Sequence, residues 1–79
     1  MKSILIIGLG RFGRHLCRKF MSLNNEVMIV DRDEAAVTAL ADEATSAQIA
    51  DCTDENALRA LGVKNFDLCF VCIGSDFAS

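Results

Sequence analysis

Three glycines near the start of the chain are spaced so that the backbone itself could do chemistry. Gly8, Gly10 and Gly13 form a G-x-G-x-x-G pattern that follows an aliphatic run and opens an amphipathic stretch. In that position the first glycine permits a tight turn, the second lets a pyrophosphate approach the backbone, and the third lets a helix pack closely on a strand. The helix that begins there offers unpaired N–H groups and a partial positive charge to phosphates. The pattern predicts a phosphate-binding turn, the alternative being a turn without a ligand.

An acidic residue follows at the spacing that such a site requires. Asp31 lies 18 residues after Gly13, at the end of the second apolar run. At about this spacing a carboxylate accepts hydrogen bonds from the ribose hydroxyls of adenosine and disfavours the 2′-phosphate of NADP. Arg32 keeps that exclusion from being absolute. Arg11, inside the glycine pattern, is expected to contact a phosphate, the alternative being a solvated surface charge.

Further candidate residues stand where other predicted strands end. Asp51 and Cys52 follow the third apolar run, and Ile73 and Gly74 close the fourth. Carboxyl ends of parallel strands share one edge of a sheet, and ligands of open α/β sheets bind at that edge. Asp51 is open to a second interpretation, because an aspartate followed by Thr53 and two acids is also typical of a helix start.

The elements that must position these residues alternate along the chain. The apolar runs predict strands over residues 4–7, 27–30, 47–50 and 68–73, separated by stretches of helical spacing. Strands that alternate with helices imply right-handed crossovers and a parallel sheet. We therefore expect an α/β fold, β-α-β-α-β-α-β, of the Rossmann-like doubly wound type. Its strand order is predicted to be 3-2-1-4, truncated before the later strands of that fold.

Each helix has a predicted start or a predicted buried face. The first, from residue 11 to about residue 23, has one apolar stripe at spacings of four, four and three: Phe12, Leu16, Phe20 and Leu23. Asp33 is expected to cap the second helix, which turns Val37 and Leu40 inward. Thr53 is expected to cap the third helix, and Gly62 to end it.

Composition excludes several classes of protein. The chain has 79 residues, 52% of them apolar, with a net charge of -3, which indicates one small globular domain without nucleic acid as a partner. Its longest apolar run, over residues 68–73, is too short to cross a bilayer. The start has no secretory signal, so we expect a cytoplasmic protein with free cysteines. Cys69 and Cys72 would lie on opposite faces of a strand, which favours core packing over redox or metal chemistry.

Together these segments resemble the regulator-of-potassium-conductance domains, also called TrkA-N domains. Residues 8–13, GLGRFG, look like the GxGRFG loop of that family, and Asp31 like its acid after the second strand. Residues 50–55, ADCTDE, are similar to its (G/A)-D-A-T-(D/E)-E segment, with Cys52 in place of the more usual alanine. Residues 73–79 fit its (I/T)-G-x-(D/N)-x-x-(A/S) stretch. We accordingly expect residues 1–79 to be the N-terminal nucleotide-binding domain of a longer chain.

The resemblance also implies a role for each candidate residue. The phosphates would be held by the glycine loop, which comprises Gly8, Leu9, Gly10, Arg11, Phe12 and Gly13. Asp31 would hold the adenosine ribose, and Arg32, Asp51 and Cys52 would form the rim around the adenine. Ile73 and Gly74 would line the crevice. The resemblance implies neither a catalytic residue nor a metal ligand.

The function implied by the family is regulatory. NAD or NADH, or else ATP or ADP, would bind this domain and shift a homo-oligomer, a dimer or a ring of dimers, that gates a potassium channel or transporter from the inner face of the membrane. The main alternative is the cofactor-binding half of an NAD-dependent dehydrogenase, because fold alone does not fix function. A third possibility is a structural or interaction domain without a ligand.

Overall fold

Strands and helices alternate along residues 1–72, the part of the chain that the computed structural model describes. The strands are β1 (Ser3–Ile7), β2 (Glu26–Asp31), β3 (Ser46–Ile49) and β4 (Leu68–Val71). The helices are α1 (Arg11–Ser22), α2 (Glu34–Leu40) and α3 (Glu55–Ala60), with short 3-10 turns η1 (Ala41–Glu43) and η2 (Val63–Asn65). The predicted order of elements is confirmed.

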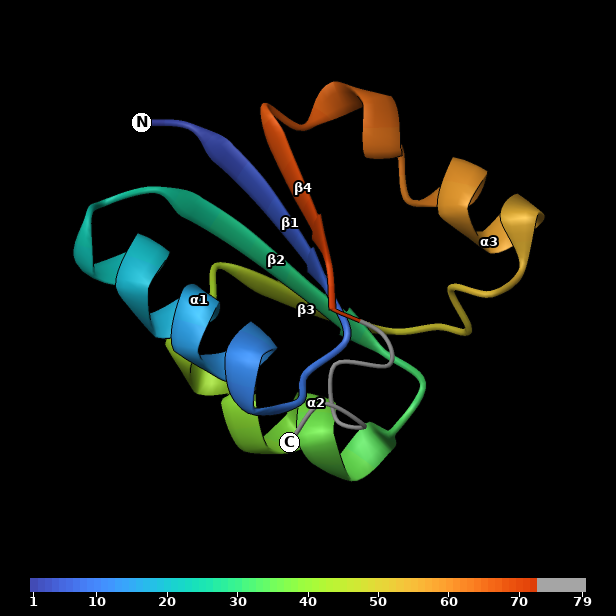
Figure 1. Cartoon of the computed structure of the whole chain (residues 1–79), viewed down its shortest axis with the longest axis horizontal. Coiled ribbons are helices and arrows are strands. Elements are labelled where there is room, and N and C mark those ends of the chain that lie inside the picture. Colours follow the sequence, from blue (N-terminus) through green and yellow to red (C-terminus); the bar gives the residue numbers. More distant parts are fainter. Residues whose placement is uncertain (73–79) are drawn as a thin grey trace.

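The four strands form one parallel sheet in the order β3-β2-β1-β4, which confirms the predicted fold class and strand order. Figure 1 shows α1 and α2 together on one side of the sheet and α3 apart from them. The side chains agree with this layering. Ile4 and Ile6 pack with the residues of α1 and α2, whereas Leu5 and Ile7 pack with those around α3. Because β1 is covered on both faces, its aliphatic run is continuous rather than alternating.

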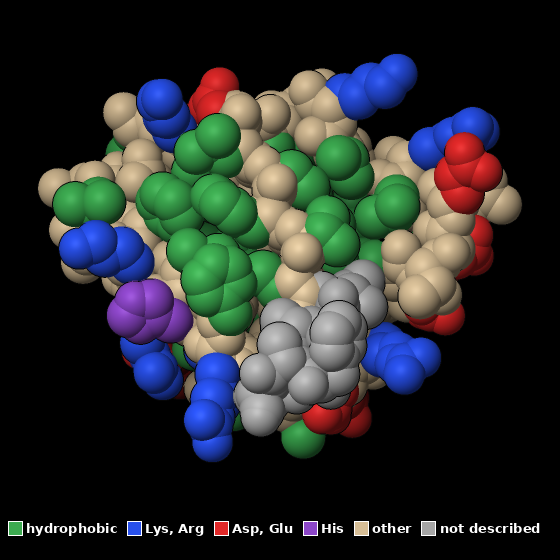
Figure 2. Space-filling view, viewed as in Figure 1, with side chains coloured by type: hydrophobic (Ala, Val, Ile, Leu, Met, Phe, Trp, Pro, Cys, Tyr) green, Lys and Arg blue, Asp and Glu red, His purple; other side chains and the backbone are tan. Residues whose placement is uncertain are grey.

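The buried face of α1 differs from the predicted stripe. Phe12 is 54% exposed and Leu23 is 57% exposed, while Gly13 and Cys17 are the buried residues of the helix. These two small residues let the helix axis approach the sheet closely, so the bulky stripe is displaced to one side. Phe20 remains half-buried, with its ring centroid 5.4 Å from that of Phe70 on β4. Figure 2 shows hydrophobic side chains gathered on the surface over the region that α1 and β4 occupy in Figure 1.

The helix ends follow local hydrogen bonds. Asp33 caps α2 as predicted, accepting a hydrogen bond from the Ala35 N–H at 3.0 Å. The predicted cap of α3 is wrong: Asp54, not Thr53, accepts from the first turn, at 2.9 Å from the Asn56 N–H. The helix begins at Glu55, one residue later than a Thr53 cap would require, and the Thr53 hydroxyl instead donates to Asp51 at 2.6 Å.

Gly62 follows α3 with a φ of 71°, a left-handed conformation that favours glycine, and so ends the helix as predicted.

Cys69 on β4 and Cys72, which directly follows that strand, lie on opposite faces of the sheet, as predicted. Cys72 is buried in the core beside α1, but Cys69 is exposed, so the expectation of core packing is wrong for that residue. The reason is position: β4 is an edge strand of the described sheet, and its α3-facing side is incompletely covered. Cys17, Cys52, Cys69 and Cys72 are all free thiols.

No helix within residues 1–72 has both the length and the apolar character that a membrane crossing requires.

Candidate functional site

A cleft of about 480 Å³ opens at the carboxyl ends of β1, β2 and β3. Figure 1 shows these strand ends converging where β1 leads into α1. The volume lies in the range of small-molecule sites. The cleft is lined by backbone and side chains of Ile7, Gly8, Leu9, Gly10, Asp31, Arg32, Asp33, Ala36, Ala50, Asp51, Cys52, Thr53 and Cys72. One wall is therefore the glycine loop, and the opposite wall is the turn after β3.

The glycine loop is folded by two close approaches. Gly8 has a φ of 94°, and its N–H donates to the Val30 carbonyl at 2.8 Å, which turns the chain out of the sheet. A Cβ on Gly13 would overlap the carbonyl oxygen of Gly8. The first and third glycines are therefore required by the turn and by helix packing.

The start of α1 supplies the donors of the site. Gly10 is the N-cap, with extended backbone and no capping side chain, and the first helical hydrogen bond runs from the Arg14 N–H to the Gly10 carbonyl at 3.0 Å. The N–H groups of the preceding turn have no acceptor within a helix. The first turn has no acidic residue. An anion at this end of α1 would be stabilised by the N–H groups and by the helix dipole.

Asp31 already has two partners in the structure. Its Oδ2 accepts a hydrogen bond from the Leu9 N–H at 2.8 Å, and its Oδ1 accepts one from the Asp33 N–H at 2.9 Å. An ionised carboxylate has about four acceptor positions, so two remain for the hydroxyls of a ligand. The carboxylate thus joins the glycine loop to the turn before α2 while facing the cleft.

Asp51 has only local partners. Its Oδ1 accepts hydrogen bonds from both the hydroxyl and the N–H of Thr53, at 2.6 and 3.0 Å. These two bonds, and more weakly the positive charge of Arg32, lower the pKa of Asp51. Both interpretations of Asp51 therefore have a structural basis, because it shapes the turn before α3 and presents a carboxylate to the cleft.

Two thiols give part of the cleft a nonpolar character. Burial raises the pKa of Cys52, with smaller contributions from the charges of Asp51 and Asp31, and burial raises the pKa of Cys72. Both side chains are accordingly neutral near pH 7. Together with Ile7 they form apolar surface of the kind that a planar base packs against.

The structure brings together most of the predicted site residues, whose binding role stays a prediction. Seven of them line the cleft: Gly8, Leu9, Gly10, Asp31, Arg32, Asp51 and Cys52. Arg11 and Phe12 are exposed on α1 and do not line the cleft. Gly13 does not line it either, but its close packing against the Gly8 carbonyl shapes the glycine loop. The predicted crevice residues Ile73 and Gly74 lie outside the described residues.

Sequence reasoning did not identify several lining residues. Asp33 and Thr53 each follow a candidate aspartate by two positions and donate an N–H to it. That i, i+2 pattern after a predicted strand was the available signal. Ala36, Ala50 and Cys72 carry no such signal, because only the tertiary fold brings them to the cleft.

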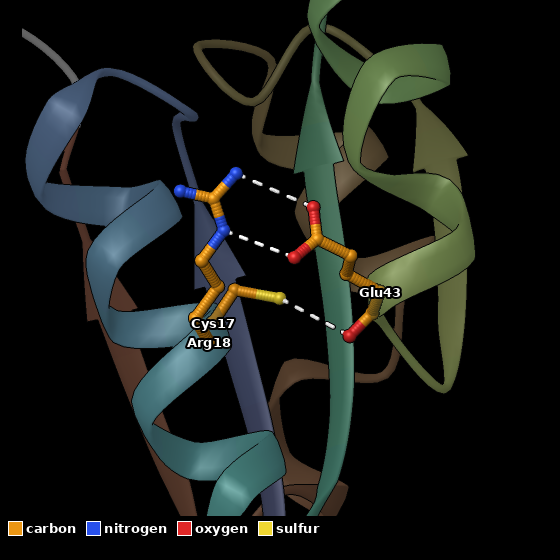
Figure 3. Close-up of polar contacts among 3 residues, drawn as sticks. All are labelled: Cys17, Arg18 and Glu43. Atoms are coloured by element: carbon orange, nitrogen blue, oxygen red, sulfur yellow. Dashed lines mark hydrogen bonds and ion pairs between the residues drawn. The ribbon is translucent and has the colours of Figure 1, made fainter.

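A second set of contacts joins α1 to η1, the 3-10 turn that follows α2. Arg18 forms an ion pair with Glu43, with Nε and Nη2 donating to the two carboxylate oxygens at 3.0 and 3.3 Å (Figure 3). The hydrogen bond raises the pKa of Arg18 and lowers that of Glu43. The buried Cys17 thiol, whose pKa is raised by burial, donates weakly to the Glu43 carbonyl at 3.9 Å. These contacts hold the helix whose N-terminus faces the cleft.

Within residues 1–72, no group of three or more His, Cys, Asp or Glu side chains is arranged to hold a metal ion. The cleft instead combines helix N–H groups, carboxylates and apolar surface. This combination suits binding of a ligand with both anionic and planar parts.

Known proteins resemble this chain in sequence. The family model of the TrkA-N domain matches residues 4–79. Ktr system potassium uptake proteins A and C of Bacillus subtilis (strain 168) are each 44% identical to it over 75 residues, 95% of this chain and 34% of each relative. Ktr system potassium uptake protein A of Vibrio alginolyticus is 33% identical over the same shares. The chain thus spans 34% of the length of these relatives.

Solved structures resemble it in fold. N5-carboxyaminoimidazole synthetase from Staphylococcus aureus, in complex with ADP, aligns with 89% of this chain at a TM-score of 0.72 and 26% identity. Saccharopine dehydrogenase from Saccharomyces cerevisiae aligns with 99% of it at a TM-score of 0.73 and 25% identity. In each case the chain covers 18% of the larger protein. Both support the Rossmann-like assignment.

Proposed function

The chain belongs to the TrkA-N domain family, and we propose that it is a regulatory domain of a potassium uptake system that binds an adenine nucleotide. The single observation that carries this proposal is the cleft between the glycine loop and the turn after β3. It combines an anion-binding helix start with a carboxylate at the end of β2 and an apolar wall. These match the three parts of a nucleotide: phosphate, ribose and base.

Each part of the ligand has a place in the proposed complex. The phosphates lie at the N-terminus of α1, above Gly10, where N–H groups are without helical acceptors. The ribose hydroxyls donate to the remaining acceptor positions of Asp31. The adenine packs against the apolar surface around Cys52, with Asp51 and Arg32 at the rim.

The ligand class is NAD or NADH, with ATP or ADP as the other candidates. All four contain an adenosine ribose with free hydroxyls and at least two phosphates. NADPH has a phosphate on that ribose, which would face the carboxylate of Asp31 and bind more weakly.

Potassium transport as the process rests on the Ktr relatives. In this proposal the domain acts from the cytoplasmic side on a membrane potassium transporter or channel subunit, as part of a homo-oligomer. Ligand binding biases the assembly toward the arrangement that binds the ligand more tightly. The coupling free energy equals that difference in affinity and cannot exceed it.

We propose a regulatory rather than an enzymatic role. A dehydrogenase cofactor domain is the competing function, favoured by the fold similarity to saccharopine dehydrogenase. That alignment covers 18% of the enzyme, so the shared part is the nucleotide-binding fold without the rest of the enzyme. The enzyme is 25% identical to this chain, whereas the two Bacillus subtilis Ktr relatives are each 44% identical, and the TrkA-N model matches residues 4–79.

Calorimetric titration tests the proposal. The chain is titrated with NADH, NAD, ATP, ADP and NADPH under identical conditions, beside the variant Gly10→Asp, which places a carboxylate where the phosphates would lie. We expect saturable binding of at least one of the first four, weaker binding of NADPH and none by the variant. Absence of binding by all five nucleotides would overturn the proposal.

A further inference from the structure

We propose that Asp31 is a positioning residue for phosphate binding: its carboxylate holds the glycine loop in the conformation that directs the N-terminus of α1 at the phosphates. This role is separate from any contact with the ribose. The inference rests on the proposed function, since it concerns the same cleft.

The two oxygens of Asp31 bind two different segments. Oδ2 accepts from the Leu9 N–H at 2.8 Å, across 22 residues of sequence, and Oδ1 accepts from the Asp33 N–H at 2.9 Å. Asp33 is in turn the cap of α2. One half-buried carboxylate therefore connects the start of α1, through the glycine loop, with the start of α2.

Leu9 is fixed through both its backbone N–H and its side chain. Its N–H is bound by Asp31, and its side chain is 4% exposed within the core cluster that includes Cys17 and Val37. The preceding N–H, that of Gly8, donates to the Val30 carbonyl at 2.8 Å. With these two donors used, those left for a phosphate begin at Gly10 and continue into the first turn of α1. The carboxylate thus determines which donors face the ligand and in what direction.

A positioning role for Asp31 and a purely electrostatic effect of its charge predict opposite changes in anion affinity when the carboxylate is removed. A carboxylate beside the phosphate site repels an anion, so removing its charge alone would strengthen anion binding. If the carboxylate holds the loop, removing it weakens anion binding, although the charge becomes more favourable. Asp51 provides the matched control, because it lines the same cleft but binds only Thr53.

Inorganic tripolyphosphate is the probe that separates positioning from ribose binding, because it has no ribose. Its affinity is measured by NMR titration of the Gly10 and Arg11 amides, which reports only on folded molecules. We expect Asp31→Ala to weaken tripolyphosphate binding about tenfold, the size of a lost charged hydrogen bond. Asp31→Asn retains one acceptor and should lie in between, whereas Asp51→Asn should bind at least as tightly as the unchanged chain. Equal or tighter binding by Asp31→Ala overturns the inference.

Amide hydrogen exchange without ligand gives a second, independent test. Exchange of the Leu9 amide should become about tenfold faster in Asp31→Ala than the loss of global stability alone accounts for, the strand amides of β1 serving as the reference for that loss. If the unchanged chain binds neither nucleotide nor tripolyphosphate, the proposed function fails, and this exchange measurement still decides whether Asp31 holds the loop. A Leu9 exchange rate that changes no more than those of the β1 strand amides would overturn the inference.

Discussion

The two walls of the cleft are held in different ways. On the glycine-loop side, hydrogen bonds join residues far apart in sequence, as between Leu9 and Asp31. On the other side, the hydrogen bonds within residues 51–66 of the described chain all join residues no more than four apart. That segment is attached to the sheet by apolar contacts, chiefly Leu58, Leu61, Val63 and Phe66 against the far side of β1.

The ion pairs show the same contrast. Arg18 and Glu43 connect α1 with η1 across 25 residues, through two hydrogen bonds. Arg59 and Glu55 lie one turn apart within α3, at 3.4 Å, and connect it to nothing else. α3 also has no buried residue of its own, whereas α1 buries Gly13 and Cys17.

The difference suggests a separate function for each wall of the cleft. Cross-linking by contacts distant in sequence preorganises the phosphate wall before the ligand arrives, which lowers the entropic cost of binding. A wall held by local bonds and a few apolar contacts can adjust at little cost. We therefore expect the phosphate contacts to be shared by all ligands, and the adaptable wall to respond to the rest of each ligand.

The largest expected effect comes from a matched pair of glycines, one in each region. Gly13→Ala places a Cβ against the Gly8 carbonyl oxygen and should lower the free energy of unfolding by about 3 kcal/mol, despite the better helix propensity of alanine. Gly62→Ala, with a φ of 71° in the locally held region, should cost about 1 kcal/mol. Urea unfolding measures both. Equal losses of unfolding free energy in the two variants would contradict the proposed difference in packing between the two regions.

Amide exchange should show the contrast without any mutation. Because α3 is held mainly by local bonds, its amides should exchange about a hundredfold faster than those of β1 and β2. The amides of α1 should resemble the strands. Native-state hydrogen exchange followed by NMR provides the measurement, and comparable protection of α1 and α3 would contradict the comparison.

The two aspartates of the cleft, Asp31 and Asp51, extend the comparison between its two walls to the free energy of unfolding. Asp31→Ala removes the acceptor of two backbone N–H groups, one of them distant in sequence, and should lower the free energy of unfolding by about 2 kcal/mol. Asp51→Ala removes only bonds to Thr53, and its effect should be clearly smaller. Chemical denaturation of both variants is the check. A larger loss at Asp51 would reverse the roles assigned to the two walls.

The smallest expected effect is a dependence on pH. The pKa of Glu43 is lowered by Arg18, so the ion pair stabilises the fold above the ordinary pKa of a glutamate and loses this effect as pH falls through the lowered value. The difference in Tm between the unchanged chain and Glu43→Gln should therefore be largest near neutral pH and vanish in acid. Glu55→Gln, which breaks the local pair, should change Tm less at neutral pH. A difference in Tm that grows as pH falls would contradict the stabilising role of the Arg18–Glu43 pair.

Much of the fold could be predicted from the sequence, because its signals are local. The aliphatic run of β1, the turn at the glycine pattern and the capping Asp33 each depend on neighbouring residues, and each is confirmed as local structure. The alternation of strands and helices predicted the parallel sheet, and the doubly wound fold type predicted its strand order. The exposure of Phe12 was not predictable in this way, because it depends on how closely Gly13 lets α1 approach the sheet.

The candidate site also has features that local sequence signals predict and features that depend on tertiary contacts. Five of the seven predicted residues that line the cleft were found from spacing and from the rule that strand ends share an edge, whereas Leu9 and Arg32 were named as site residues through the family resemblance. The bond from Leu9 to Asp31 was not found, because a spacing pattern identifies a carboxylate without identifying its hydrogen-bond partners. The cap of α3 is Asp54 and not the neighbouring Thr53, whose hydroxyl donates to Asp51, because the position at which a helix begins is not decided by two adjacent capping residue types.

The central claim is that an adenine nucleotide binds the cleft with its phosphates at the start of α1. NMR titration of the ¹⁵N-labelled chain with NADH, NAD, ATP and ADP in turn tests it most directly. The account predicts that at least one of the four gives saturable shifts concentrated at the amides of the glycine loop and of the turns after β2 and β3, with Gly10 among the largest, and no such shifts in Gly10→Asp. Saturable shifts confined to residues outside the cleft, or none with any of the four, would contradict it.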